Sequence, residues 1–361
     1  MIPFLALTPG VDAADVRAAI ARVVERGWFV LGPELEAFEQ EFAEACGAPH
    51  AVGVGTGTDA LALALRALGV GPGDEVITSP LSAAYSALAI MMAGARPVFA
   101  DIDPERLTLD PRAADAAVTP RTKAIMPVHL YGQPADMPAL MQVAARHRLL
   151  VVEDCCQAHL ATCGGAPVGS FGAAAAYSFY PTKNLGALGD GGALTVADAG
   201  VAAHVRRLRN GGQTDRYHHG EFGVNSRLDE IQAAVLRARL AWLPRWTAQR
   251  RALATEYRRR LAGGPVTVPP ERDPGHVYHL FPILSPGRDA LQARLQARGI
   301  ETLIHYPVPI PRQPALASER PEQCPIADRV CREVLSVPLH PGMTLEAVEE
   351  VAGALYADTE P

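Results

Sequence analysis

The chain has 361 residues, of which 48% are hydrophobic and 20% are charged, and its formal net charge is −6. This composition is typical of a globular protein, and the scattered basic residues argue against a nucleic-acid surface. No run of 18 uncharged apolar residues occurs, which argues against a membrane span. Six cysteines are too few for a disulfide framework, and the N-terminus lacks the basic start of a signal peptide, so we expect a cytoplasmic protein.

The chain begins with two predicted amphipathic helices. In the second, ELEAFEQEFAEAC at residues 34–46, Leu35, Phe38, Phe42 and Ala45 fall on one face. This spacing predicts that the helix packs on a core through that face.

From residue 50 to about 200, short β-branched runs alternate with patterns rich in Ala and Leu. The predicted helices cover residues 58–70, 82–95 and 137–148, and the predicted strands cover 50–55, 74–79, 96–102, 123–130, 149–154, 174–180 and 192–196. This alternation predicts an α/β fold with a mostly parallel sheet that is covered on both faces.

A long helical pattern then runs over residues 226–262, with a bend expected at Pro244. The remainder is predicted as a strand at 276–284, a helix at 287–299, strands at 301–306 and 333–339, and a last helix from Thr344. We therefore predict a large α/β domain over residues 1–260, including the long helix, and a small α+β domain over residues 261–361.

One lysine, Lys183, lies in a polar turn within SFYPTKNLGALGDGGALTV at residues 178–196, close to Ser178, Tyr180 and Asn184. A lysine amine can form a Schiff base with pyridoxal phosphate (PLP). That chemistry also requires an acid for the pyridine nitrogen, a phosphate site and a flat partner for the ring.

An acid is present in LLVVEDCCQAH, an apolar strand that ends in Glu153-Asp154. Ligands of parallel sheets collect at the carboxyl ends of strands, so Asp154 is the candidate for the pyridine nitrogen. The structural alternative is that Asp154 caps a following helix. Gln157 is suited to a hydrogen bond with the ring oxygen of the cofactor.

A phosphate site is predicted in GVGTGTDALALAL, which reads as a strand, a glycine turn and a helix. The amides of Gly57, Thr58 and Asp59 would lie unpaired at the helix N-terminus, where an anion is stabilised. The glycine spacing differs from a dinucleotide fingerprint. Ser178 could add a hydroxyl to the same phosphate.

Four residues that can bind metals lie close together: Cys155, Cys156, His159 and Cys163. Their spacing matches no usual zinc pattern, and adjacent cysteines on an extended segment point to opposite faces. We predict buried thiols and no metal site.

The phosphate turn, the acid, the serine and the lysine follow one another along the chain, and at this point the sequence becomes recognisable. It resembles the DegT/DnrJ/EryC1/StrS family of PLP-dependent sugar aminotransferases over essentially its whole length. The resemblance is carried by GPELEAFEQEFA, GTGTDALALALRALGVGPGDEVI, VVEDCCQAH, GSFGAAAAYSFYPTKNLGALGDGGAL, NSRLDEIQAAVL and HYPVPIPRQPA.

The resemblance implies the fold-type I architecture of PLP enzymes and a homodimer with active sites at the subunit interface. It implies Lys183 as the Schiff-base lysine and Asp154 as the partner of the pyridinium. The implied cofactor-binding residues are Gly57, Thr58, Asp59, Tyr85, Asp154, Gln157, Ser178, Lys183 and Asn225, with Asn225 reaching the phosphate of the neighbouring subunit. The implied substrate residues are Tyr180, Asn184, His305 and Tyr306.

Two of these residues carry open alternatives. Family members place an aromatic ring over the pyridine in the segment SPLSAAYSAL, where an ungapped match puts Ala83 or Ala84. Tyr85 is the stacking candidate, and its alternative is a core tyrosine. Asn225 could instead cap the helix that is expected to start near Ser226.

The expected reaction transfers an amino group from L-glutamate or L-glutamine to a keto-sugar, such as a 3-keto or 4-keto sugar on a nucleoside diphosphate. Amination of a cyclitol ketone is an alternative acceptor chemistry. A sugar dehydratase is a further alternative, but such relatives replace the lysine by histidine, whereas Lys183 is present. A PLP-binding regulator is disfavoured because the sequence carries no recognisable DNA-binding segment.

Overall fold

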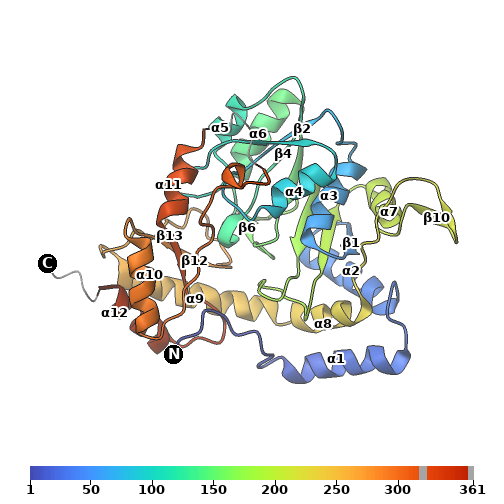
Figure 1. Cartoon of the computed structure of the whole chain (residues 1–361). Coiled ribbons are helices and arrows are strands. Elements are labelled where there is room, and N and C mark those ends of the chain that lie inside the picture. The colour runs from blue at the N-terminus through green and yellow to red at the C-terminus, as the bar shows by residue number, and fades with distance from the viewer. Residues whose placement is uncertain (317–322, 357–361) are drawn as a thin grey trace.

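The computed structural model describes residues 1–316 and 323–356. Its centre is a seven-stranded sheet in the order β1-β9-β8-β5-β4-β2-β3 (Figure 1). The strands are β1 (His50–Val54), β2 (Glu75–Thr78), β3 (Arg96–Phe99), β4 (Thr122–Met126), β5 (Leu150–Asp154), β8 (Ala174–Ser178) and β9 (Gly192–Val196). Only β9 runs antiparallel to its neighbours, so the predicted mostly parallel sheet is confirmed.

Helices cover both faces of this sheet. They are α2 (Pro33–Cys46), α3 (Gly57–Ala67), α4 (Tyr85–Met92), α5 (Pro111–Ala116), α6 (Met137–His147) and α7 (Ala199–Leu208). The first helix, α1 (Ala13–Arg26), packs instead on α8 (Glu230–Leu240). Successive strand residues enter different cores: Val151 packs with α2 and α6, and Val152 packs with α3, α4 and α7. This alternation follows from the pleat and explains why the strands are apolar throughout.

The buried face of α2 matches the face predicted from the sequence except at one residue. Leu35, Phe38 and Phe42 are buried as expected, but Ala45 is exposed and Cys46 is buried. Cys46 lies three full turns after Leu35 and therefore returns to the same face, whereas Ala45 lies beside it.

The long helical pattern is divided into α8 (Glu230–Leu240) and α9 (Leu243–Leu261). The break lies at residues 241–242, and Pro244 occupies the first turn of α9, where its missing N–H costs nothing. The predicted bend is therefore confirmed as a break just before the proline.

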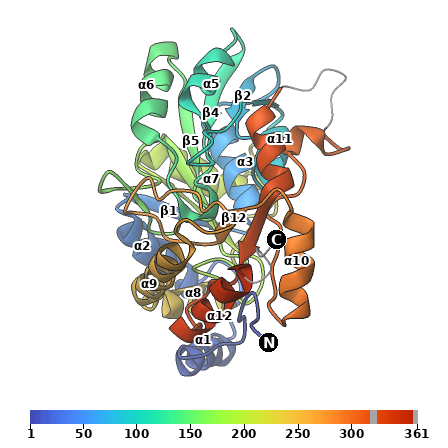
Figure 2. The ribbon, with the colours of Figure 1, turned by 90° about the vertical axis from the view of Figure 1, so that its left-hand side faces the viewer.

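The C-terminal part contains an antiparallel pair, β12 (Phe281–Leu284) and β13 (Val334–Val337), with α10 (Arg288–Ala297), α11 (Pro325–Glu333) and α12 (Leu345–Tyr356). Figures 1 and 2 show α10 and α12 next to the N-terminus. Their core also includes Leu253 and Tyr257 of α9. The division of the chain at residue 260 stays a prediction.

Two predicted strands of this part are wrong in extent, and α11 was not predicted. Residues 276–280 form no strand because they bond to a loop: Val277 N–H donates to Gly132 O at 3.0 Å. Residues 301–306 make only an isolated bridge, between Leu303 and Ser336.

The remaining short elements are β6 (Thr162–Cys163), β7 (Ala166–Pro167), β10 (Gln213–Asp215), β11 (His218–His219), η1 (Leu130–Gly132) and η2 (Ile310–Arg312). Within the described residues, no helix combines the length and the apolarity that crossing a membrane would need.

The N-terminus of α2 is capped by a residue far away in the sequence. Its N-cap, Gly32, has no side chain, and the buried carboxylate of Glu230 takes over. Glu230 Oε1 accepts from the N–H groups of Gly32 and Leu35, and Oε2 accepts from that of Glu34, each at 2.9 Å. This contact joins α8 to α2, on which the sheet packs.

We predict that Glu230→Gln lowers the free energy of unfolding by about 2–3 kcal/mol, because an amide turns donors toward helix N–H groups that need acceptors. The measurement is urea unfolding followed by circular dichroism. Glu36→Gln is the control, since Glu36 is an exposed acid in the same first turn, and its change should stay below about 0.5 kcal/mol. Equal losses in the two variants would contradict the capping role of Glu230.

Candidate active site

The predicted site residues gather at one edge of the sheet, where α3 begins and where β5 and β8 end. The approach is close: a Cβ on Gly57 would lie 2.8 Å from both Cys156 Sγ and Ser178 Cβ. On the other side, a Cβ on Gly192 would lie 2.3 Å from the carbonyl carbon of Thr56. Glycine at both positions therefore lets the N-terminus of α3 reach the strand ends.

The N-terminus of α3 offers fewer amides than the sequence predicts. Thr56 is the N-cap, and its hydroxyl accepts from the N–H of Asp59 at 3.0 Å. The amides of Gly57 and Thr58 donate to no residue in the described part of the chain. These two amides are available to an anion at the helix N-terminus, and that of Asp59 is used in the cap.

Ser178 and Asp59 complete the surroundings of this helix end. Ser178 Oγ accepts from Tyr180 N at 3.3 Å, and its hydroxyl donates to none of the described residues, so its proton is available to a ligand. The Asp59 carboxylate is used within the protein, because it accepts from Ser226 Oγ at 2.8 Å. The same Ser226 oxygen accepts from Gly55 N at 2.9 Å, which fixes the glycine turn.

Asp154 is a buried carboxylate with neutral partners. Its Oδ2 accepts from Ser86 Oγ at 2.9 Å and its Oδ1 accepts from Cys156 N at 3.1 Å. Among the described residues none forms an ion pair with it within 4 Å. A buried charge without a counter-ion is costly, and a protonated pyridine nitrogen would supply the missing cation. The alternative that Asp154 caps a helix is wrong, because residues 155–161 contain none.

Ser86, in the first turn of α4, is a site residue that the sequence did not reveal. Serines are common at helix starts, so its type carried no signal, and only the fold brings α4 to the end of β5.

Lys183 follows β8 in a turn closed by its own N–H, which donates to Tyr180 O at 2.8 Å. Burial lowers the pKa of Lys183, and the neighbouring Cys156 and Asp154 partly oppose this shift. Its side-chain nitrogen bonds to no described residue, as the contacts of the turn show. A lowered pKa increases the share of neutral amine, which is the nucleophilic form.

Gln157 connects the site to the C-terminal segment. Its Oε1 accepts from Tyr131 N at 2.8 Å, and its Nε2 donates to Tyr306 Oη at 3.0 Å. The Tyr131 hydroxyl donates to His305 O, so residues 305 and 306 are held over the sheet edge from two sides. Burial raises the pKa of Tyr306 to about 12, which keeps its hydroxyl protonated.

Two of the tyrosines predicted as site residues, Tyr85 and Tyr180, lie at the surface of this chain. Tyr85 is 63% exposed at the start of α4, so the alternative of a core tyrosine is wrong. Tyr180, in the Lys183 turn, is 52% exposed. Both rings are therefore free to meet a ligand or another chain.

The two asparagines behave differently from each other. Asn184 is buried; its Nδ2 donates to Val277 O at 3.1 Å and its Oδ1 lies 3.2 Å from His279 Nδ1. It therefore ties the Lys183 turn to residues 277–279. Asn225 is exposed, and it does not cap a helix, because α8 begins at Glu230 with Asp229 as its N-cap.

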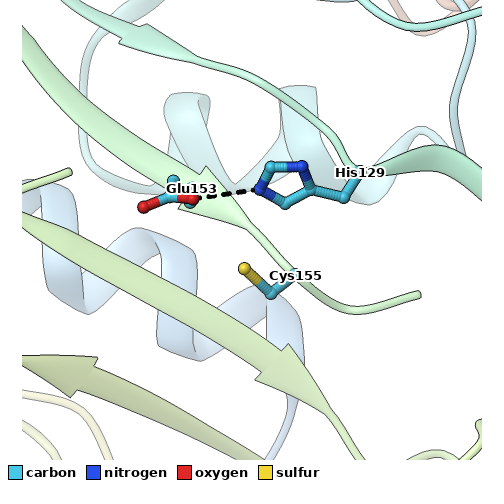
Figure 3. A group of neighbouring side chains, drawn as sticks. All are labelled: His129, Glu153 and Cys155. Carbon is cyan, nitrogen blue, oxygen red and sulfur yellow. Dashed lines mark hydrogen bonds and ion pairs between the residues drawn. The ribbon is translucent and has the colours of Figure 1, made fainter. Parts of the chain in front are cut away.

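Among the described residues, His129, Glu153 and Cys155 lie close enough together to hold a metal ion (Figure 3). This group differs from Cys155, Cys156, His159 and Cys163, for which the sequence predicted buried thiols and no metal site. Glu153 accepts from the N–H groups of Gly169, Phe171 and Gly172, and its Oε2 lies 3.1 Å from His129 Nε2. His129 Nδ1 accepts from Ala135 N, so Nε2 carries the proton and donates to Glu153. These bonds occupy the ring nitrogens of His129 and the oxygens of Glu153, and they fasten the turn at 169–172 to β5.

The cysteines of this region are free thiols. Cys155 and Cys163 are buried as predicted, but Cys156 is only half-buried because it lies beside the open edge at Gly57. Burial raises the pKa of the Cys155 thiol well above its ordinary value.

An α/β sheet that brings a lysine of lowered pKa, a buried acid and an open helix N-terminus to one edge has the groups that a PLP-dependent enzyme requires. The DegT/DnrJ/EryC1/StrS aminotransferase family matches residues 11–356, and the chain belongs to that family.

Proteins of known name are similar in sequence to this chain over nearly its full length. The chain is 51% identical to dTDP-3-amino-3,4,6-trideoxy-alpha-D-glucose transaminase of Streptomyces venezuelae, over 94% of this chain and 91% of that protein. It is 44% identical to UDP-N-acetyl-3-dehydro-alpha-D-glucosamine 3-aminotransferase of Acidithiobacillus ferrooxidans, over 94% and 92% of the two chains. A crystal structure of S. venezuelae DesV with a ketimine intermediate is 48% identical, with a TM-score of 0.96 over 100% of this chain and 99% of that one.

The expected family, the fold-type I architecture and the PLP cofactor are thus confirmed. The donor set fits this cofactor, since the amides of Gly57 and Thr58 and the hydroxyl of Ser178 can donate to a phosphate and the Asp154 carboxylate has no ion-pair partner among the described residues. The roles of single residues stay predictions.

We predict that Asp154→Asn lowers turnover at least about 100-fold, near 3 kcal/mol, because the amide keeps the size of the side chain but cannot hold a proton on the pyridine nitrogen. Single-turnover kinetics of the PLP-loaded protein measure the loss. Asp190→Asn is the control, because Asp190 is exposed after the Lys183 turn and should leave turnover within about twofold. Near-normal activity of Asp154→Asn would mean that another residue holds the nitrogen.

Proposed function

We propose that the protein transfers the amino group of L-glutamate or L-glutamine to a 3-keto sugar carried by a nucleoside diphosphate. The observation that carries the proposal is Lys183 beside Asp154 in a chain 51% identical to a sugar transaminase. The choice of carbon 3 is supported by two relatives, whose names place the amino group at that position.

When bound, PLP supplies an electron sink for the carbon next to the transferred nitrogen. We assign to Lys183 the covalent attachment of the cofactor aldehyde and, when released, the movement of the proton at the reacting carbon. Its lowered pKa supports this assignment, because a neutral amine can accept that proton. Asp154 would hold the proton on the pyridine nitrogen.

The phosphate of the cofactor would be held by the amides of Gly57 and Thr58 and the hydroxyl of Ser178. Gln157 retains one amide hydrogen beyond its bond to Tyr306, and this hydrogen would reach the ring oxygen. Tyr85 remains the candidate for ring contact. His305 and Tyr306 would close over the sugar, a role supported by their attachment to Tyr131 and Gln157.

We also propose a homodimer with shared active sites. Exposed large apolar side chains include Trp28 and Phe29 between α1 and α2, Tyr85 and Met92 of α4, and Tyr180 and Leu188 around the Lys183 turn. A second copy of the chain would cover these side chains. The free cysteines support a reducing compartment, and we place the protein in the cytoplasm.

We predict that borohydride reduction links PLP to Lys183, as read by peptide mass spectrometry. The chain has one other lysine, Lys123, which is exposed and serves as an internal control. Lys183→Ala should bind PLP without a covalent bond and lose turnover by at least about 1,000-fold, whereas Lys123→Ala should keep both properties. Cofactor found on Lys123, or activity in Lys183→Ala, would overturn the assignment.

The shared site gives a separate prediction, on Asn225. Its exposed amide would donate to the phosphate of the partner, a charge-assisted bond worth about 1.5–3 kcal/mol. In a mixed dimer of Lys183→Ala with Asn225→Ala, both defects would then fall in one site and leave the other intact. Mixing should recover up to about half of wild-type activity.

As a control for this mixing experiment, the two variants carry different affinity tags, and purification over both tags shows that mixed dimers are present. If such dimers are present and activity is not restored, Asn225 acts within its own chain. That result would remove Asn225 from the partner's site.

A further inference from the structure

Ser86 joins α4 to the buried acid of the site. It lies in the first turn of α4 and is 2% exposed, and its Oγ donates to Asp154 Oδ2 at 2.9 Å. The direction of this bond is fixed when the carboxylate is ionised, because an ionised carboxylate can only accept. The single hydrogen of the Ser86 hydroxyl is therefore committed to Asp154.

A second buried serine lies behind the first. Ser82 is 5% exposed, and its Oγ lies 3.4 Å from Ser86 Oγ. Since Ser86 gives its only hydrogen to Asp154, Ser82 is the donor in this longer contact. The hydroxyls thus form an oriented row from Ser82 through Ser86 to Asp154, in which each bond polarises the next and points its hydrogen toward the carboxylate.

The backbone around Asp154 favours the same charge. Asp154 Oδ1 accepts from Cys156 N at 3.1 Å, and the bond to Ser86 places Oδ2 beside the first turn of α4. The N-terminus of a helix carries partial positive charge, which stabilises a nearby anion. These contacts stabilise the ionised carboxylate more than the neutral acid.

Among the described residues, none supplies Asp154 with a cation within 4 Å. The titratable groups that interact with its charge include Cys155, Cys156, Tyr306 and Lys183. Burial raises the pKa of both thiols and that of the Tyr306 hydroxyl, so these three groups are neutral near pH 7. Burial lowers the pKa of Lys183, whose amine is bound to the cofactor in the proposed reaction. The charge of Asp154 therefore depends on its hydrogen-bond donors.

We propose that Ser86 is a positioning residue that keeps the Asp154 carboxylate ionised and so keeps their shared proton on the pyridine nitrogen of the cofactor. In the competing arrangement that one proton moves from the nitrogen to Asp154, which leaves a neutral acid beside a neutral ring. A hydroxyl that donates to the carboxylate disfavours this arrangement, because a neutral acid is a poorer acceptor. The protonated ring is the stronger electron sink, so turnover depends on Ser86. The inference rests on the proposed role of Asp154 and adds what controls its charge.

The first experiment records the ¹⁵N NMR signal of PLP labelled at the pyridine nitrogen, in the loaded protein without substrate. The unchanged protein should show a protonated nitrogen. Ser86→Ala should shift the proton equilibrium by about 10-fold toward the unprotonated nitrogen, because one charge-assisted bond to the carboxylate is lost. Asp154→Asn gives the reference signal of a site without the carboxylate. An unchanged signal in Ser86→Ala would overturn the proposal.

Two further variants make this result specific. Thr78→Val also removes a buried hydroxyl, one that donates to Met126 O at 2.9 Å and not to Asp154, and it should leave the ¹⁵N signal unchanged. Ser86→Cys keeps a side chain of similar size with a weaker donor, so its signal should lie between those of the unchanged protein and Ser86→Ala. If Ser86→Ala does not fold, Ser86→Cys decides the test in its place. Equal shifts in Thr78→Val and Ser86→Ala would also refute the proposal.

The second experiment asks whether Ser86 acts through Asp154. Ser86→Ala should slow turnover about 10-fold when Asp154 is present, and less than about twofold in Asp154→Asn, where there is no carboxylate to keep ionised. Equal losses in the two backgrounds would mean that Ser86 only supports the local fold, and the proposal would be wrong.

The outcomes also separate this inference from the proposed function. The ¹⁵N signal requires neither an amino acid nor a sugar. A Ser86-dependent signal without turnover of any keto-sugar would therefore contradict the proposed function and support this inference. If Asp154→Asn itself leaves the signal unchanged, another residue holds the nitrogen, and both the role of Asp154 and this inference are wrong.

Discussion

The site depends on one close contact, the approach of the α3 N-terminus to the ends of β5 and β8 and to the start of β9. Gly57 lies against Cys156 and Ser178, and Gly192 lies against the backbone of Thr56. A side chain at either glycine would push the helix away by more than a flexible neighbour can absorb. Because the contact is this close, the free amides of the helix lie at the same edge as Asp154 and Lys183.

The site is preorganised by a buried acid that the described residues leave without an ion-pair partner. Asp154 is held by a hydroxyl and an amide, so none of the described cations neutralises it. By contrast, the carboxylate of the neighbouring Glu153 is fully used, because it accepts hydrogen bonds from four donors. That saturation anchors β5 and the turn at 169–172, and the backbone that carries Asp154 is rigid as a result.

The sequence by itself determined the class of this protein. Alternation of apolar strands and Ala/Leu-rich helices is a local property, and it was sufficient for the α/β sheet. The order of the phosphate turn, the acid and the lysine is also readable along the chain, because each part lies at the end of a predicted strand. A carboxylate at the end of a parallel strand, such as Asp154, is already a candidate ligand-binding group. The ends of neighbouring parallel strands lie at one edge of the sheet, so the phosphate turn, the acid and the lysine come together although they are far apart in the sequence.

The tertiary structure decided what depends on contacts between distant segments. It showed that Ser86 donates to Asp154 and that Asn184 bonds to residues 277–279. It also replaced the strand expected at 276–280 by a loop that bonds to Gly132. Local pattern could not supply these results, because a hydrogen-bond partner more than 50 residues away leaves no periodic trace, and a serine or asparagine reads the same whether it binds water, backbone or an active-site acid.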